Sequence, residues 1–271
     1  MTSIVFNVLL FFTGVNEMKK FAVVVAACSL MTICTPVFAL GDFAFNLTSD
    51  FYSKYVWRGQ LLNDDPVFQP GITVGYKGFT FGAWGNADLT DYTGNSGEFT
   101  EWDYTLSYGG KFSPDSKLNY SVGVIHYQFP SSELDTTEVF WGLSYETFLN
   151  PSITVYHDID EAGGGIYANF GISHTIEKAL KLSESVSADL VLGASVGWGN
   201  DEYNEWYWGV DSARFNDLTL KASLPIALSN GWSVTPSFSY VMLIDGNIRD
   251  TDAYATNSDY FIAGVSIGKS F

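Results

Sequence analysis

The sequence has 271 residues, a formal net charge of −17 at pH 7, 17% aromatic residues and two cysteines. So acidic a chain repels phosphate backbones, which makes nucleic acid a poor partner. An acidic chain that is also rich in aromatic residues is not expected to be disordered.

Residues 1–39 are predicted to be a leader. A short basic start at Met18 precedes an apolar core, and Val37-Phe38-Ala39 has the small-x-small form of a cleavage site. We therefore expect translation to begin at Met18, with residues 18–39 forming a signal peptide that is cleaved after its last residue. The chain would then be exported.

The domain that remains, residues 40–271, is expected to be a single β-barrel. It has no cysteine, because Cys28 and Cys34 lie in the leader, so disulfides and thiolate metal sites are not expected in it. It also has no apolar run long enough to cross a bilayer as a helix. A membrane protein without such a run has to be a closed barrel, because unpaired backbone groups are costly in lipid.

Twelve segments alternate between apolar and polar residues with the period of two that indicates β-strands. The clearest is the first, residues 42–59. Its apolar face carries Phe43, Phe45, Leu47, Phe51, Tyr55 and Trp57, and its opposite face carries Asp42, Asn46, Thr48, Asp50, Tyr52, Lys54 and Arg58. The predicted fold class is all-β, a transmembrane antiparallel β-barrel of twelve strands. Ten or fourteen strands stay open, because Pro225 and Pro236 fall in the tenth and eleventh segments and proline cannot donate to a ladder.

The fifth segment, residues 118–129, changes parity part-way. Its apolar residues have even numbers as far as Val124 and then move to Ile125 and Tyr127. A one-residue β-bulge at this point would restore the pattern, and it would turn His126 toward the lumen.

The links between segments alternate in length. Those after even-numbered segments are compact, among them 177–185, which contains a weak helical turn over 177–184, and 229–231, which has an Asn-Gly hairpin signal. Several links after odd-numbered segments are longer, namely 60–70, 91–99, 199–216 and 245–259. Short turns at one end and long loops at the other are typical of outer-membrane barrels, so we expect both termini in the periplasm.

The last segment, residues 259–271, alternates through Phe261, Val265, Ile267 and Phe271. A closing strand that ends on an aromatic residue is typical of outer-membrane barrels, in which it carries the assembly signal. The expected partners are therefore the barrel-assembly machinery, through the strand ending in Phe271, and the lipid and lipopolysaccharide of the outer membrane.

No catalytic or metal-binding motif stands out. His126, His157 and His174 belong to no recognisable motif, so we expect no catalytic residue, no metal site and no cofactor. The inward face instead collects polar and charged side chains, which are costly in a barrel unless they are hydrated or paired. The pore-lining candidates are Asp50, Lys54, Arg58, Asp88, Glu101, Asp103, Glu146, Tyr156, Asp158 and Asp160.

Several short motifs resemble a known family. They are Ser49-Asp50-Phe51, Tyr55-Val56-Trp57-Arg58-Gly59, Asp64-Asp65-Pro66-Val67-Phe68-Gln69-Pro70-Gly71, Phe81-Gly82-Ala83-Trp84-Gly85-Asn86, Gly123-Val124-Ile125-His126-Tyr127 and Thr137-Glu138-Val139. Together they are similar to the TorF-type porin family of Gram-negative bacteria, also called GCW-CHP, over residues 47–167. Members typically read Arg-Gly-x-Ser-Gln where this chain reads Arg58-Gly59-Gln60-Leu61. The resemblance implies an outer-membrane barrel of porin type and assigns no site residue.

These patterns favour a porin-like channel in the bacterial outer membrane. It would pass small hydrophilic solutes or ions, with a modest preference for cations because inward acids outnumber inward bases. Two other classes stay open. One is a closed structural or adhesive barrel whose lumenal charges pair with one another, and the other is an outer-membrane enzyme that modifies lipid or lipopolysaccharide.

Overall fold

The structure, a computed structural model, describes residues 39–40, 43–130, 135–184 and 186–271. Residues 1–38 of the predicted leader lie outside this range. Within the described ranges, no helix is both long and apolar enough to cross a membrane.

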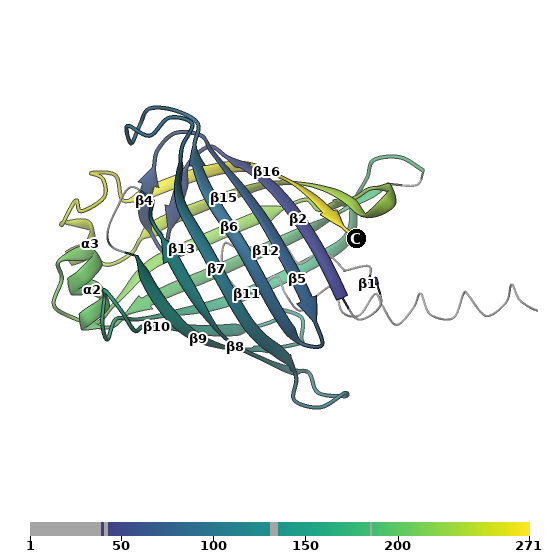
Figure 1. Cartoon of the computed structure of the whole chain (residues 1–271), viewed down its shortest axis with the longest axis horizontal. Coiled ribbons are helices and arrows are strands. Elements are labelled where there is room, and N and C mark those ends of the chain that lie inside the picture. The colour runs from purple at the N-terminus through teal and green to yellow at the C-terminus, as the bar shows by residue number, and fades with distance from the viewer. Residues whose placement is uncertain (1–38, 41–42, 131–134, 185) are drawn as a thin grey trace, which may run out of the picture.

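Twelve long strands form one closed antiparallel barrel, as the alternation predicted (Figure 1). The barrel strands are β2 (Phe43–Tyr52), β5 (Val67–Tyr76), β6 (Phe79–Asp88), β7 (Phe99–Lys111), β8 (Leu118–Gln128), β9 (Thr136–Tyr145), β10 (Ser152–Asp158), β11 (Ile166–Lys181), β12 (Ser187–Gly199), β13 (Arg214–Ser223), β15 (Trp232–Leu243) and β16 (Asp259–Ser270). The barrel closes where β16 pairs with β2, and the backbone N–H of Phe271 donates to the carbonyl oxygen of Phe45 at 3.0 Å.

Six short elements accompany the barrel in the described residues. They are β1 (Ala39–Leu40), which pairs with β2; the hairpin of β3 (Tyr55–Trp57) and β4 (Gln60–Asn63); α2 (Asp201–Trp208); β14 (Ile226–Ala227); and α3 (Gly246–Arg249). A 3₁₀ turn, Ser229–Gly231, joins β14 to β15. Pro225 falls between β13 and β14, where a proline was expected to weaken the tenth strand.

The two ends of the barrel differ, and we call them the turn end and the loop end. At the turn end lie the compact links that follow β5, β7, β9, β11 and β14, together with the C-terminus. The longer links, which include β3, β4, α2 and α3, lie at the loop end. Figure 1 shows α2, α3 and β4 together at one end, with the C-terminus and β1 toward the other.

Three details of the predicted strands are wrong. The first strand does not continue through residues 53–59, because the chain leaves the sheet after Tyr52 and folds back as the β3–β4 hairpin. The link predicted over 177–185 is shorter, since β11 runs to Lys181 after a register shift that follows Ile176. The weak helical turn predicted over 177–184 is absent, and strand β11 takes its place as far as Lys181.

The third detail is the predicted bulge in the fifth strand. β8 pairs residue by residue with both β7 and β9, with no shift near Val124. Ile125 and Tyr127 are buried and face the lumen, while His126 faces outward and lies 3.1 Å from the Thr137 hydroxyl through its Nδ1. The change of parity therefore marks a level at which large side chains fill the lumen.

The outer face of the barrel is covered with exposed apolar side chains. Phe261 is 60% exposed, Phe79 is 54% and Leu106 is 52%. Others on the same face are Phe45, Leu47, Phe51, Ile72, Phe81, Val122, Val139, Trp141, Phe170, Ile172, Leu192, Leu220, Phe238 and Ile267. A continuous apolar surface of this kind is stable in lipid and not in water, so the barrel has the outer face of a membrane protein.

Candidate functional site in the lumen

The inward residues of a strand change in size along the barrel. On β8 the inward side chain is Ser121 near the turn end and Tyr127 at the loop end, and on β10 it changes from Ser152 to Tyr156. β15 and β16 show the same change, from serines and glycines to Val241, Leu243, Tyr260 and Ile262. The lumen is therefore lined by small polar groups in one half and filled by large side chains in the other.

The large side chains pack around the β3–β4 hairpin, residues 55–63, which we call the lumenal hairpin. Its two strands are joined by Arg58 and Gly59, with φ of 48° and 84°. Positive φ at both central residues is the conformation of a tight hairpin turn, which glycine adopts without steric cost. A β-carbon on Gly59 would lie 2.7 Å from Leu243 Cδ2 and 3.0 Å from Asp217 Cβ. The tip thus touches β13 and β15, which follow β16 in the sheet order starting from β2.

Arg58 at the tip also binds β9. Its guanidinium donates two hydrogen bonds of 2.7 Å to the two carboxylate oxygens of Glu138, and Tyr127 donates to the same carboxylate at 2.8 Å. Arg58 is 8% exposed and Glu138 is 2% exposed. This bidentate geometry is the strong form of an ion pair. Because both groups are buried, removing either one would leave the other as an uncompensated charge.

Aromatic rings surround the Arg58 guanidinium. Its carbon lies 4.3 Å from the ring centres of Trp57 and Tyr156, and 4.5 Å from that of Tyr167. These are distances at which a cation is attracted to an aromatic face. The ion pair is therefore held in a closed aromatic cage and not in water.

Helix α2 closes the cage from the loop end. Asn200 caps the helix by accepting from the Tyr203 backbone N–H at 2.9 Å, and the helix ends at Gly209, which has φ of 69°. The Tyr203 hydroxyl accepts from Gln60 Nε2 at 3.1 Å, which ties the helix to the lumenal hairpin. Burial raises the pKa of Tyr203 well above its ordinary value, so the phenol stays protonated.

Buried charge in this half of the lumen is unbalanced. Among the described residues the buried charged side chains are Arg58, Asp88, Glu101, Asp103, Glu138, Asp158 and Asp217, which is six acids against one base. All six lie on inward positions of barrel strands. The electrostatic field of this half therefore favours positive charge.

Several predicted pore-lining residues meet at this level. Arg58 packs on Tyr156, and Tyr55 of the hairpin donates to Glu101 at 2.9 Å. Asp158 ends β10 and accepts from Thr136 at 2.8 Å, and Asp88 accepts from Asn86 at 3.0 Å. Tyr55 and Trp57, which the alternation placed on the apolar outer face, belong to the lumenal hairpin instead.

The other candidates lie elsewhere. Lys54 is at the base of the lumenal hairpin and pairs with Asp64. Asp50 accepts from the Ser266 hydroxyl across the closing seam. Glu146 follows β9 at the turn end and pairs with Lys111 at 2.8 Å. Asp160 lies beyond the end of β10 with an exposed side chain, so it is in a loop and not on a strand.

The sequence reasoning did not single out Glu138, Tyr203 and Asp217 as site residues. Glu138 fell on the inward parity of its strand, but nothing local showed that Arg58 would reach it. Asp217 lies within a register shift between β12 and β13, so a period-two pattern does not give its orientation. Tyr203 lies in a loop helix, where alternation gives no information.

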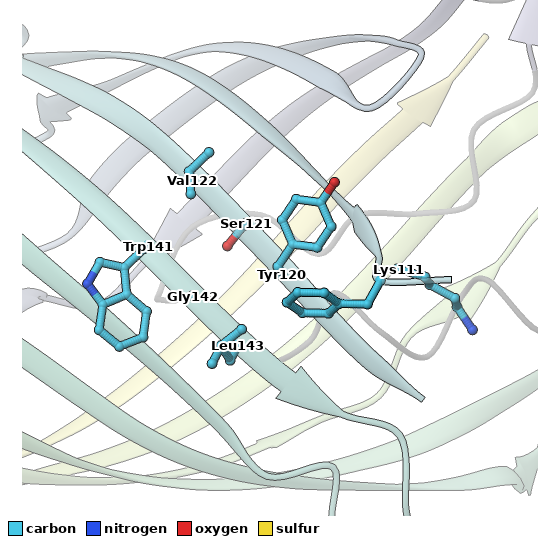
Figure 2. Close-up of a pocket in the computed structure, with 8 residues that line it drawn as sticks. Lys111, Tyr120, Ser121, Val122, Trp141, Gly142 and Leu143 are labelled. Carbon is cyan, nitrogen blue, oxygen red and sulfur yellow. The ribbon is translucent and has the colours of Figure 1, made fainter. Parts of the chain in front are cut away.

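The wall near the turn end has a depression between β8 and β9 (Figure 2). Figure 2 shows Tyr120 and Val122 of β8 beside Trp141 and Leu143 of β9. These side chains are on the outward positions of their strands, so the depression lies in the part of the surface that faces lipid.

No protein-family model matches the sequence, and no curated protein matches it either. Solved structures of similar shape include the NanC porin, with 12% identity over 84% of this chain and 98% of that chain and a TM-score of 0.47. The KdgM porin has 11% identity over 84% of this chain and 99% of that chain, with a TM-score of 0.49. The COG4313 outer membrane channel from Pseudomonas putida F1 has 6% identity over 87% and 97%, with a TM-score of 0.48.

Proposed function

We propose that the chain is a porin-like channel of the bacterial outer membrane for small hydrophilic solutes or ions, with a modest preference for cations and a restriction at its loop end formed by the lumenal hairpin. The observation that carries this proposal is the division of the lumen. Eight strands make a barrel that side chains can just fill, so twelve strands leave space wherever the inward residues are small. Thr73, Ser107, Ser121, Ser195 and Thr219 face inward and keep partial exposure, which is expected of a water-filled vestibule.

The location follows from the outer surface and the closing strand. The exposed apolar face requires lipid, and the Phe271 strand completes the seam with β2. We assign the turn end to the periplasm and the loop end to the outside. The barrel-assembly machinery, outer-membrane lipid and lipopolysaccharide are then the partners, and membership of the TorF-type family remains a hypothesis from the sequence.

The preference for cations rests on the buried acids. Low-dielectric walls focus the field of such groups and raise the local concentration of ions of the opposite sign. Since only Arg58 opposes the six acids among the described buried side chains, a cation entering this half is stabilised and an anion is repelled.

The test is conductance in a planar bilayer. Replacing residues 55–63 by a short Gly-Ser link should raise the single-channel conductance severalfold, because it removes the only described segment that crosses the lumen from one wall to the other. The control removes Gly94 and Asn95, two residues whose described hydrogen bonds stay within the loop between β6 and β7, and should leave conductance unchanged. If the deletion variant folds but conducts no better than the wild type, the proposed channel is contradicted.

A closed barrel is the second candidate, because the lumenal hairpin and its aromatic cage fill the loop-end half. It predicts no wild-type conductance over the full range of voltage. The same deletion separates the two candidates, since a barrel with a structural role only would have no continuous aqueous path in its other half either.

The third candidate function, an enzyme that modifies lipid or lipopolysaccharide, has less support. His126, His157 and His174 all have outward positions, and the His174 Nδ1 lies 2.8 Å from the Phe148 carbonyl oxygen. Hydrolysis of lipid by the wild type that is lost in His126→Ala would be required to favour it.

A further inference from the structure

An acid and a base face the lumen in the middle of the barrel, at the border between its two halves. One row of cross-strand partners runs across the neighbouring strands β2, β16, β15 and β13 and consists of Tyr52, Gly264, Ser237 and Ser223. Asp50 is the next inward residue of β2 on the turn-end side of this row, and Lys221 is the next inward residue of β13 on the loop-end side. The two charged groups therefore border the same short stretch of the lumenal wall.

Asp50 and Lys221 are near each other but do not form an ion pair. Both side chains are partly exposed and their charges interact electrostatically, yet the pair is not among the ion pairs that the described residues form. Asp50 accepts from the Ser266 hydroxyl. No hydrogen bond from the Lys221 ammonium occurs within the described part of the chain, and this group is not among the buried atoms that lack a partner. The ammonium is therefore open to the lumen.

The wall beside these groups leaves space. Gly193 is the direct partner of Lys221 on β12, and a β-carbon on this glycine would come no closer than 3.7 Å to another atom. The ring of Tyr52 lies against Gly264, where an added β-carbon would collide with it. Tyr52 also packs on the buried cluster that includes residues of the lumenal hairpin. The acid and the base thus lie where the half lined by small side chains ends against the filled half.

An acid and an amine that are held apart in a lumen attract different groups of a solute. A solute that is only an anion is repelled by Asp50, and one that is only a cation is repelled by Lys221. A molecule with both an ammonium and a carboxylate can satisfy the two side chains through charge-assisted hydrogen bonds. We propose that Asp50 and Lys221 bind small zwitterionic solutes of the amino-acid class, with Asp50 accepting from the ammonium and Lys221 donating to the carboxylate.

This site deepens the proposed function and rests on it for one point, that solutes reach the lumen. It assigns a solute class to the border of the turn-end half, whereas the cation preference arises from the buried acids of the loop-end half. Binding of zwitterions and selection of ions are therefore separate properties of the barrel.

Binding to the purified barrel in detergent, measured by saturation-transfer NMR, tests the site without requiring conduction. The probes are L-alanine, L-lactate, in which a hydroxyl replaces the ammonium, and L-alaninol, in which a hydroxymethyl group replaces the carboxylate. Alanine should bind about tenfold more tightly than either of the others, the order expected from one hydrogen bond to a charged group.

Two substitutions should change the preference in opposite directions. Lys221→Met removes the ammonium, so it should weaken alanine binding about tenfold and let alaninol bind at least as well as alanine. Asp50→Asn keeps an oxygen that accepts from Ser266 but removes the charge, so it should weaken alanine binding by a similar factor and let lactate bind at least as well as alanine. A residue with a structural role only would not exchange the preference in this way.

The matched control is Lys111→Met, at the end of β7. It removes the same charge from a lysine that pairs with Glu146 at 2.8 Å. Alanine affinity should stay within about twofold of the wild type, because a distant charge is screened by salt. Folding of each variant is checked by heat-dependent mobility on a denaturing gel.

Two results would overturn the inference. One is that the wild type binds alanine no more tightly than lactate and alaninol. The other is that alanine binds equally well to the wild type, Lys221→Met and Asp50→Asn, which would place the solute elsewhere. A barrel that binds alanine through these residues but conducts no ions contradicts the proposed channel and not the site, whereas a conducting barrel without a preference for alanine contradicts the site alone.

Discussion

The same strands line both halves of the lumen, but their inward side chains are small in the turn-end half and large in the loop-end half. On β12, Gly193 and Gly197 share the inward face, but a β-carbon on Gly193 would come no closer than 3.7 Å to another atom, the carbonyl oxygen of Ile172. A β-carbon on Gly197 would collide with the Tyr167 hydroxyl and with Asp217. The same barrel is thus tightly packed at one level and less crowded at another, and the size of the inward side chains sets the difference.

One ion pair from each end of the barrel gives the largest expected contrast. Arg58→Ala leaves Glu138 buried without its partner, which should lower the free energy of unfolding by about 3–5 kcal/mol. Lys111→Ala, at the turn end, breaks a pair whose side chains are 25% and 28% exposed, and it should cost about 1 kcal/mol or less. Urea titration of the barrel in lipid measures both values. Equal losses of unfolding free energy would mean that water reaches the loop-end ion pair as readily as the turn-end pair.

The glycines of β12 test the same contrast without charge. Gly197→Ala should lower the free energy of unfolding by about 1–3 kcal/mol, because the added methyl group has to displace Tyr167 or Asp217. Gly193→Ala, on the same strand and face, should change it by about 0.5 kcal/mol at most, as expected away from packed sites. If Gly193→Ala lowers the free energy of unfolding as much as Gly197→Ala does, the lumen around Gly193 is as tightly packed as the lumen around Gly197.

The smallest expected effect concerns ion selectivity. Asp158→Asn removes a charge that is 1% exposed in the lumenal wall, so the reversal potential in a potassium chloride gradient should shift toward zero. Asp160→Asn removes an exposed loop charge, which salt screens, and it should shift the potential less. An equal shift in the two variants would place the selective step in the loops.

The architecture was predictable because alternation is strict where one face meets lipid. The twelve strands, their antiparallel order and the sorting of short and long links all follow from that pattern. Inward positions such as Glu101 and Asp103 also followed from parity, since their neighbours Trp102 and Tyr104 are outward.

The lumenal hairpin was not predictable from alternation. Residues 53–59 continue the parity of β2, so a strand in the wall and a strand in the lumen look the same. The only local signal is Arg58-Gly59, a turn pair with left-handed backbone at both positions. The bulge was inferred because the pattern assumes that inward residues are polar, whereas Ile125 faces inward and packs among the large side chains that fill this level.

The ends of the lumenal hairpin have a consequence for engineering. Tyr52 and Val67, the residues that flank the excursion, are direct partners in the β2–β5 ladder. The ladder is therefore already closed behind the hairpin, and the segment between these two residues can be exchanged without altering barrel closure. Lengthening such an excursion costs little, since the entropy of closing a loop grows only slowly with its length. A foreign peptide grafted between Tyr52 and Val67 would thus be held inside the lumen of the barrel.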